Sequence, residues 1–186
     1  MDMVLTQFFE LFLIYIPLTI LVAGVYFIIA KLLVKKKKCG KLKPLTVIIY
    51  SVFTSYIFML IYMTLMDNGL MAGGAGGINL IPFNFGDPTD KYYHLTIGYG
   101  IFGNILLFIP FGLLIPFIIK KHRIYCFVAP LVSSIAIEII QIPIGRTCDI
   151  NDVIFNEAGA CIGIGIFFIL YFIKTCITKR TKNTTE

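Results

Sequence analysis

The 186-residue chain is strongly apolar and weakly charged, which excludes an ordinary soluble domain. Hydrophobic residues make up 58% of the sequence, charged residues 14%, and the mean hydropathy is +0.90. Soluble domains carry about 25% charged residues, so we expect an integral membrane protein of the all-α class. The formal net charge of +6 indicates membrane topology and incidental affinity for anionic lipid, and it does not point to nucleic acid.

Five apolar runs predict the helices of a polytopic transmembrane bundle. Each run reaches roughly the 20 residues that a helix needs to cross about 30 Å of hydrocarbon. The runs fall at about 8–34, 45–66, 98–119, 124–142 and 153–173. They predict two N-terminal spans with a basic loop (1–66), a core made of a long loop and three spans (67–176), and a basic tail (177–186).

Lysine and arginine lie almost entirely on one side of this predicted bundle. Fourteen of the 16 basic residues lie at the end of the first span or after it, between spans three and four, or in the tail. Because positive charge concentrates on the cytoplasmic side of membrane helices, we expect a cytoplasmic C-terminus. The N-terminus and the loops at 67–97 and 143–152 would then face outward.

Polar side chains gather where the last three predicted spans meet the outer face. Hydrocarbon tolerates such groups poorly, so they need partners or a task. Span three contributes one side-chain amide, and span four ends with one carboxyl and one amide. The loop before span five contains one arginine, and span five begins with several acidic and amide side chains. The candidate binding residues are Asn104, Glu138, Gln141, Arg146, Asp149, Asp152, Asn156 and Glu157.

Several of these residues have both a structural and a functional interpretation. Arg146 either forms an ion pair that holds the 143–152 loop or meets a phosphate or carboxylate of a ligand. Asp149 or Asn151 is also a candidate cap of the fifth helix. We expect Asn104 to find its partner in Gln141 or Glu138.

Spacing within the spans and loops gives further expectations. The pattern Gly159-x-x-x-Gly163 favours close helix packing, and Pro110 and Pro116 should kink or locally open span three. The segment 78–85 is too apolar for a free loop and too short to cross, so we expect it in the outer interface. The five cysteines are scattered and predict neither a disulfide framework nor a zinc site.

Four ordered motifs resemble those of the VanZ-like membrane protein family. They are Asn79-Leu80-Ile81-Pro82-Phe83, the stretch 103–112, Glu138-x-x-Gln141, and the run from Arg146 through Asp152 and Asn156 to Gly159. The resemblance covers about 78–173 and adds Asn79 to the candidate site. It implies a multi-pass protein of the bacterial plasma membrane, typical of Gram-positive bacteria, and a link to the cell envelope. The namesake of the family is associated with low-level teicoplanin resistance.

Three mechanisms from different classes follow from this pattern. The first is binding of an amphipathic ligand: a lipid headgroup, a lipid-linked cell-wall precursor or a lipoglycopeptide. The alternative is a membrane enzyme that acts on a lipid headgroup, a hydrolase or transferase, with carboxylates or a divalent cation held by Asp149, Asp152 and Asn156. The third is a transporter or an assembly partner of cell-wall synthesis proteins, with Glu138 as a buried proton or cation site.

Overall fold

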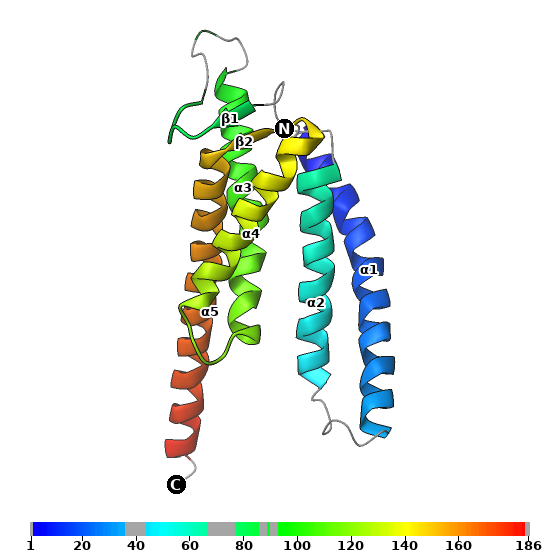
Figure 1. The fold of residues 1–186 in the computed structure, drawn as a ribbon. Helices are drawn as coiled ribbons and strands as arrows, with labels where there is room; N and C mark the ends of the chain where they lie inside the picture. The colour runs from blue at the N-terminus through cyan, green and yellow to red at the C-terminus, as the bar shows by residue number, and fades with distance from the viewer. Residues whose placement is uncertain (1, 36–43, 67–76, 86–88, 90–92, 185–186) are drawn as a thin grey trace. The chain divides into compact units, whose positions relative to one another are not determined.

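The computed structural model describes residues 2–35, 44–66, 77–85, 89 and 93–184 (Figure 1). The chain divides into two compact units, Met1–Ala72 and Gly73–Glu186, which are described separately below. The predicted boundary at 66/67 and most of the first basic loop lie outside the described residues. Which way the termini face stays a prediction.

The predicted class, an all-α membrane bundle, is confirmed. Five long helices are described, and four of them are long and apolar enough to cross a membrane. In α1 the apolar stretch Tyr15–Ile29 is shorter than these four. The four candidate spans are Pro44–Leu65, Gly100–Ile118, Tyr125–Ile144 and Ile150–Arg180.

The first unit pairs α1 (Asp2–Lys35) with α2 (Pro44–Ile61). Proline is well suited to the first position of α2, because the amide that it lacks has no helical partner there. Two tyrosine hydroxyls of α1 reach α2: Tyr15 donates to the carbonyl of Val52 at 3.1 Å, and the Tyr26 hydroxyl lies 3.1 Å from that of Thr54. A π-helical turn, Tyr62–Met66, continues α2.

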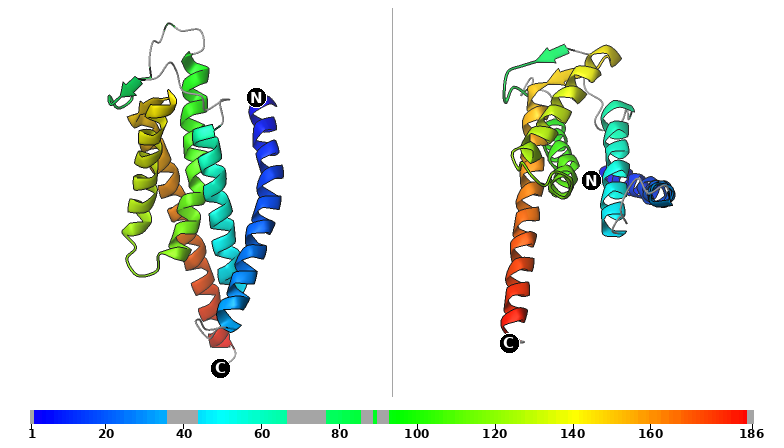
Figure 2. Two further views of the ribbon diagram at one scale, coloured as in Figure 1. Left: turned by 45° about the vertical axis from the view of Figure 1, so that its right-hand side comes forward. Right: turned by 60° about the horizontal axis from the view of Figure 1, so that its bottom comes forward.

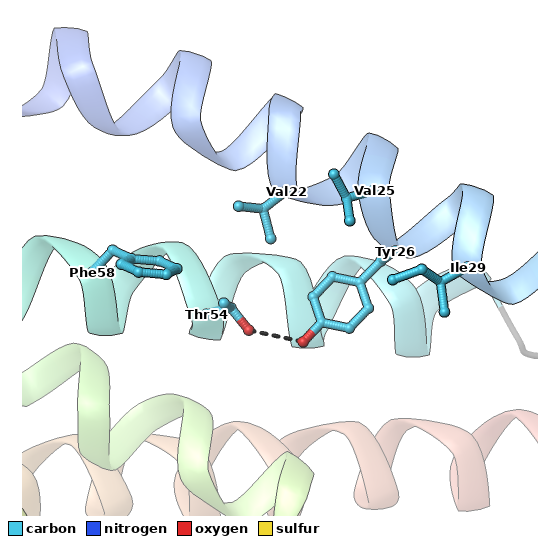
Figure 3. A pocket seen from close by; sticks show the side chains of 6 residues that line it. All are labelled: Val22, Val25, Tyr26, Ile29, Thr54 and Phe58. Carbon is cyan, nitrogen blue, oxygen red and sulfur yellow. Dashed lines mark hydrogen bonds between the residues drawn. The ribbon is translucent and has the colours of Figure 1, made fainter.

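A small apolar pocket lies between these two helices (Figure 3). It has a volume of about 310 Å³ and is lined by Val22, Val25, Tyr26, Ile29, Thr54 and Phe58. The hydrogen bond between Tyr26 and Thr54 closes one wall and satisfies both hydroxyls. The lining therefore offers an almost wholly apolar surface.

The second unit packs α3 (Tyr93–Ile118), α4 (Tyr125–Gln141) and α5 (Ile150–Thr184) side by side (Figures 1 and 2). Small residues let α3 and α5 approach backbone to backbone: a Cβ on Gly159 would collide with the Ile105 carbonyl, and one on Gly163 with that of Ile109. The packing predicted for these two glycines is confirmed. Gly112 of α3 lies in the same way against Ala160.

The helix α3 continues through Pro110 and Pro116 to Ile118. Pro116 and Phe111 are both buried, so the proline-containing half of the helix belongs to the core. At its end, Arg123 donates to the carbonyls of Pro116 at 3.1 Å and Ile119 at 3.3 Å. This arginine supplies donors to carbonyls that the end of a helix leaves without partners.

Two short strands close one end of the second unit, and the sequence did not predict them. The strand β1 (Gly77–Asn79) pairs in parallel with β2 (Thr147–Asp149), with Asn79 opposite Asp149 (Figure 1). Since β2 lies between the end of α4 and the start of α5, this pairing fixes the 78–85 segment at the same end as the polar residues.

Candidate functional site

The turn between α4 and β2 brings Arg146 back over the end of α4. After Gln141 the chain makes a short 3-10 turn, Ile142–Ile144, and Gly145 adopts the left-handed conformation with φ 78°. Glycine suits this position because it has no Cβ to clash. The amide of Arg146 then donates to the carbonyl of Gln141 at 3.1 Å, and the Arg146 side chain is buried at 9% exposure.

Asp149 connects three elements at the start of α5. Its carboxyl accepts the Asn151 amide at 2.8 Å, so it caps the helix as predicted. Both of its oxygens lie 3.1 Å from the side-chain amide of Asn79 on β1. Its own backbone amide donates to Glu138 of α4 at 2.7 Å.

Two asparagines clamp the 78–85 loop onto the start of α5. Asn79 and Asn151 both donate to the carbonyl of Asn84, at 2.9 Å and 3.0 Å. The side-chain oxygen of Asn151 also accepts the amide of Phe83 at 2.6 Å. The ring of Phe85 stacks on that of Phe155 with centroids 6.3 Å apart. The loop is thus held by polar bonds in the middle and by an aromatic contact at its end.

Among the described residues, three carboxyl groups and one guanidinium share this end of the unit. The charge of Arg146 attracts the carboxyl groups of Glu138 and Asp152, whereas Asp149 and Asp152 repel Glu138. Glu138 is 3% exposed, and Gln141 is buried beside it on the same helix face. Buried charges need partners, and the arrangement presents mainly oxygen acceptors, which suit hydrogen-bond donors and cations.

The prediction for the hydrogen-bond partner of Asn104 was wrong. Its side-chain amide donates to Asp152 of α5, at 2.6 Å, and not to Gln141 or Glu138 of α4. The reason lies in the packing: the glycines bring α3 closest to α5, so the amide on α3 meets the acid on α5 first.

One polar pair lies one turn deeper than the rest. Asn156 of α5 donates to the hydroxyl of Ser134 on α4 at 2.9 Å, and both side chains are buried. Ser134 precedes Glu138 by one helical turn, as Asn156 follows Asp152. The side-chain oxygen of Asn156 has no hydrogen-bond partner among the described residues, so a donor at this position would remove an unfavourable buried acceptor.

Glu157 stands apart from the other candidates. Its described contact is with the thiol of Cys161, 3.9 Å away on the same helix, and one of its buried oxygens has no hydrogen-bond partner among the described residues. We use "polar cluster" below for the set that the contacts bring together: Asn79, Asn104, Glu138, Gln141, Arg146, Asp149, Asn151 and Asp152.

The cation site predicted from Asp149, Asp152 and Asn156 stays a prediction. The three side chains have different partners, namely the Asn79 and Asn151 amides, Asn104 and Ser134. Within the described ranges, no three His, Cys, Asp or Glu side chains are grouped so as to hold a metal ion.

Cys148 is the thiol nearest the polar cluster. Burial raises the pKa of this thiol, and the negative charges of Glu138, Asp149 and Asp152 raise it further. A raised pKa leaves less thiolate at neutral pH, and the thiolate is the reactive form. Cys148 is therefore poorly suited to act as a nucleophile. Cys126, Cys161 and Cys176 are also free thiols, and Cys39 lies outside the described residues.

Asn84, Phe83 and Ser134 are not among the site residues predicted from the sequence. Asn84 acts through its backbone carbonyl, which no residue pattern identifies. Ser134 lies four residues before Glu138, so helical spacing could have placed it on the same face. The sequence predicts Asn151 only as a candidate helix cap, and its role in holding the loop depends on the parallel strand pairing.

The sequence matches a known protein family. The sequence model of the VanZ/LLP1 family matches residues 45–171. The match takes in α2 as well as most of the second unit, and so begins earlier than the motifs at 78–173. No curated protein and no solved structure matches the chain.

Proposed function

Since the chain belongs to the VanZ/LLP1 family, we propose that this membrane protein works in the bacterial plasma membrane, where its polar cluster binds the headgroup of an amphipathic envelope ligand. The ligand class comprises lipids, lipid-linked cell-wall precursors and lipoglycopeptides such as teicoplanin. The cluster would open to the outer face, in agreement with the distribution of basic residues along the sequence.

One observation carries this proposal. Glu138 on α4, Arg146 in the turn before β2 and Asp152 on α5 meet at the end of an otherwise apolar helix bundle, where Glu138 and Arg146 are buried and Asp152 is half-buried. A bundle that needed only stability would gain more from apolar side chains at these positions, because burying charge costs free energy even when it is paired. Charged groups at such a position point to a ligand.

The charged groups of the polar cluster indicate which kind of headgroup it would bind. Three carboxyl groups and one guanidinium favour a headgroup that donates hydrogen bonds or carries an amine over one that is only a phosphate. Asn156 adds an acceptor one turn deeper. Sugar hydroxyls, ammonium groups and amide N–H groups all provide such donors.

The test compares lipids that remain bound after purification. Native protein, Asp152→Asn and Arg146→Lys are extracted in mild detergent, and bound lipids are identified by mass spectrometry. Asn in place of Asp152 removes a charge and keeps the shape, and Lys in place of Arg146 keeps the charge and removes the planar fork. We expect both variants to lose a lipid that the native protein retains.

The matched control is Cys161→Ser, on the exposed side of α5, which should retain the same lipids as native protein. An identical lipid complement in all four proteins contradicts the proposal, provided that each variant elutes as a folded species. The contribution to teicoplanin resistance is tested separately, by comparing the susceptibility of cells that make native protein or Asp152→Asn at equal levels.

The contacts favour binding over catalysis. The sequence offers no serine or cysteine with an adjacent histidine, and the Cys148 thiol has a raised pKa. An enzyme acting on a lipid headgroup would have to rely on Glu138 and Asp152 as acid and base, and it stays the alternative. Conversion of added envelope lipids by the purified protein would support it.

A further inference from the structure

The 78–85 loop carries exposed apolar side chains at the end of the second unit where the polar cluster lies. Ile78, Leu80, Ile81 and Phe83 are 63–67% exposed. Phe102 and Ile169, on the outer faces of two candidate spans, are exposed to the same degree, at 68% and 61%. The segment 77–85 contains no charged residue. Its surface thus resembles that of the spans and not that of a water-facing loop.

The position of the loop relative to the spans decides what covers it. The candidate span in α4 ends at Ile144 and the one in α5 begins at Ile150, so β2 at 147–149 lies level with the ends of both spans. Pairing with β2 holds β1, and the loop that follows it, at this same level. Ile142 and Ile144 are exposed nearby and continue the apolar surface. A side chain at this level meets the boundary between headgroups and acyl chains.

The conformation of Phe83 shows that the loop is held in a set shape. Phe83 has φ 61°, in the left-handed region that residues with a Cβ rarely adopt. The Asn151 side chain holds its amide at 2.6 Å, and the carbonyl of the next residue accepts bonds from Asn79 and Asn151. Backbone strain of this kind persists only where surrounding contacts enforce it. Here they hold an aromatic ring in an exposed position.

We propose that the 78–85 loop is a preformed wedge that inserts Leu80, Ile81 and Phe83 into the outer acyl boundary of the bilayer, held rigid by Asn79 and Asn151. The partner is the lipid bilayer itself. The wedge would place acyl chains beside the polar cluster, but its insertion does not depend on whether that cluster binds a ligand.

The absence of tryptophan from the chain makes a direct test possible. Phe83→Trp introduces a single tryptophan, whose emission is read apart from that of the tyrosines, and the full-length protein is reconstituted in vesicles of phosphatidylcholine and phosphatidylglycerol. Parallel vesicles contain phosphatidylcholine brominated near the top or near the middle of its acyl chains. We expect blue-shifted emission, stronger quenching by the shallow bromines than by the deep ones, and little quenching by iodide. Leu80→Trp should behave in the same way and serves if the first variant does not fold.

Two further proteins complete the test. Ile135→Trp, on an exposed position near the middle of the candidate span Tyr125–Ile144, should be quenched more by the deep bromines. Asn151→Ala combined with Phe83→Trp should lose the preference for shallow bromines and become more sensitive to iodide, because the clamp is gone. Red-shifted, iodide-quenched emission from both Phe83→Trp and Leu80→Trp would overturn the proposal. Emission shielded from iodide and bromine alike would overturn it too, because protein and not lipid would then cover the loop.

Discussion

At the scale of single residues, substitutions at Phe83 can measure the free-energy cost of its backbone conformation. A left-handed residue with a Cβ costs roughly 1–2 kcal/mol relative to the ordinary helical region, and Phe83 has φ 61°. Glycine bears no such cost, whereas valine is branched at Cβ and suits positive φ least.

We therefore predict that Phe83→Gly unfolds at the same denaturant concentration as native protein or higher. Phe83→Val should be less stable than Phe83→Gly by about 1–2 kcal/mol of unfolding free energy, measured by denaturant titration in detergent. A Val variant as stable as the Gly variant would show that φ at this position is not fixed by the clamp.

The pKa of the Cys148 thiol depends on the charges around it. Burial and the negative charges of Glu138, Asp149 and Asp152 raise its pKa above the ordinary value for a thiol, so its thiolate forms only at higher pH. In a chain whose other four cysteines are serine, iodoacetamide should alkylate Cys148 more slowly at neutral pH than it alkylates N-acetylcysteine. The rate should rise at a higher pH than for that free thiol.

A second variant isolates the electrostatic part of this shift. Glu138→Gln keeps an oxygen for the Asp149 amide and removes one negative charge. It should move the rate against pH curve of Cys148 part of the way toward lower pH, because burial remains. An unchanged curve would mean that Glu138 carries no charge in the native protein at these pH values.

At the scale of elements, the close contact between α3 and α5 depends on glycines, which have no side chain. A Cβ on Gly159 would meet the backbone of Ile105, which cannot move aside as a flexible side chain could. Overpacking of this kind typically costs about 1–3 kcal/mol. Gly165 lies on the same helix, is exposed, and has nothing within 4 Å of an added Cβ.

Gly159→Ala should therefore lower the unfolding free energy by about 1–3 kcal/mol, whereas Gly165→Ala should be at least as stable as native protein, because alanine forms helices better than glycine. Steric trapping or denaturant titration in detergent measures both. Equal stability of the two variants would contradict the close approach. Since Asn104 meets Asp152 only because these helices touch, Gly159→Ala should also weaken the polar cluster.

Hydropathy predicted the helices, but it could not predict what lies between them. Long apolar runs signal a span because the whole segment must satisfy its backbone within the membrane. Strands of three residues carry too few side chains for an alternating pattern, so β1 and β2 were missed. The partner of Asn104 depended on which two helices approach most closely, and only the positions of the glycines on the facing helices decide that.

At the scale of the whole molecule, each unit has its own interior. The first pairs α1 with α2 around an apolar pocket whose hydroxyls bond to each other, and nothing on it suggests an occupant. The second unit carries its polar cluster at one end and most of its described basic residues at the other: Lys120, Lys121 and Arg123 follow α3, and Lys174, Lys179 and Arg180 lie late in α5 (Figure 1). This separation of the basic residues from the polar cluster predicts the orientation of the second unit in a membrane.

Loops rich in lysine and arginine stay on the cytoplasmic side, so the end that carries β1 and β2 should face outward. The 26 residues of α3 extend about 39 Å at 1.5 Å per residue, far enough for the two ends to lie on opposite membrane surfaces. In a cysteine-free chain, Thr89→Cys, between β1 and α3, reports one end and His122→Cys the other. Both positions are exposed, and neither change alters the count of lysine and arginine.

We predict that a membrane-impermeant maleimide labels Thr89→Cys in intact cells and labels His122→Cys only after the membrane is permeabilised. The reverse pattern would place the polar cluster in the cytoplasm, and ligands from the outer envelope could not reach it. Labelling of both in intact cells would mean that α3 does not cross the membrane. Because the labelling needs no ligand and no assay of activity, it tests the orientation on which an envelope role depends independently of any binding result.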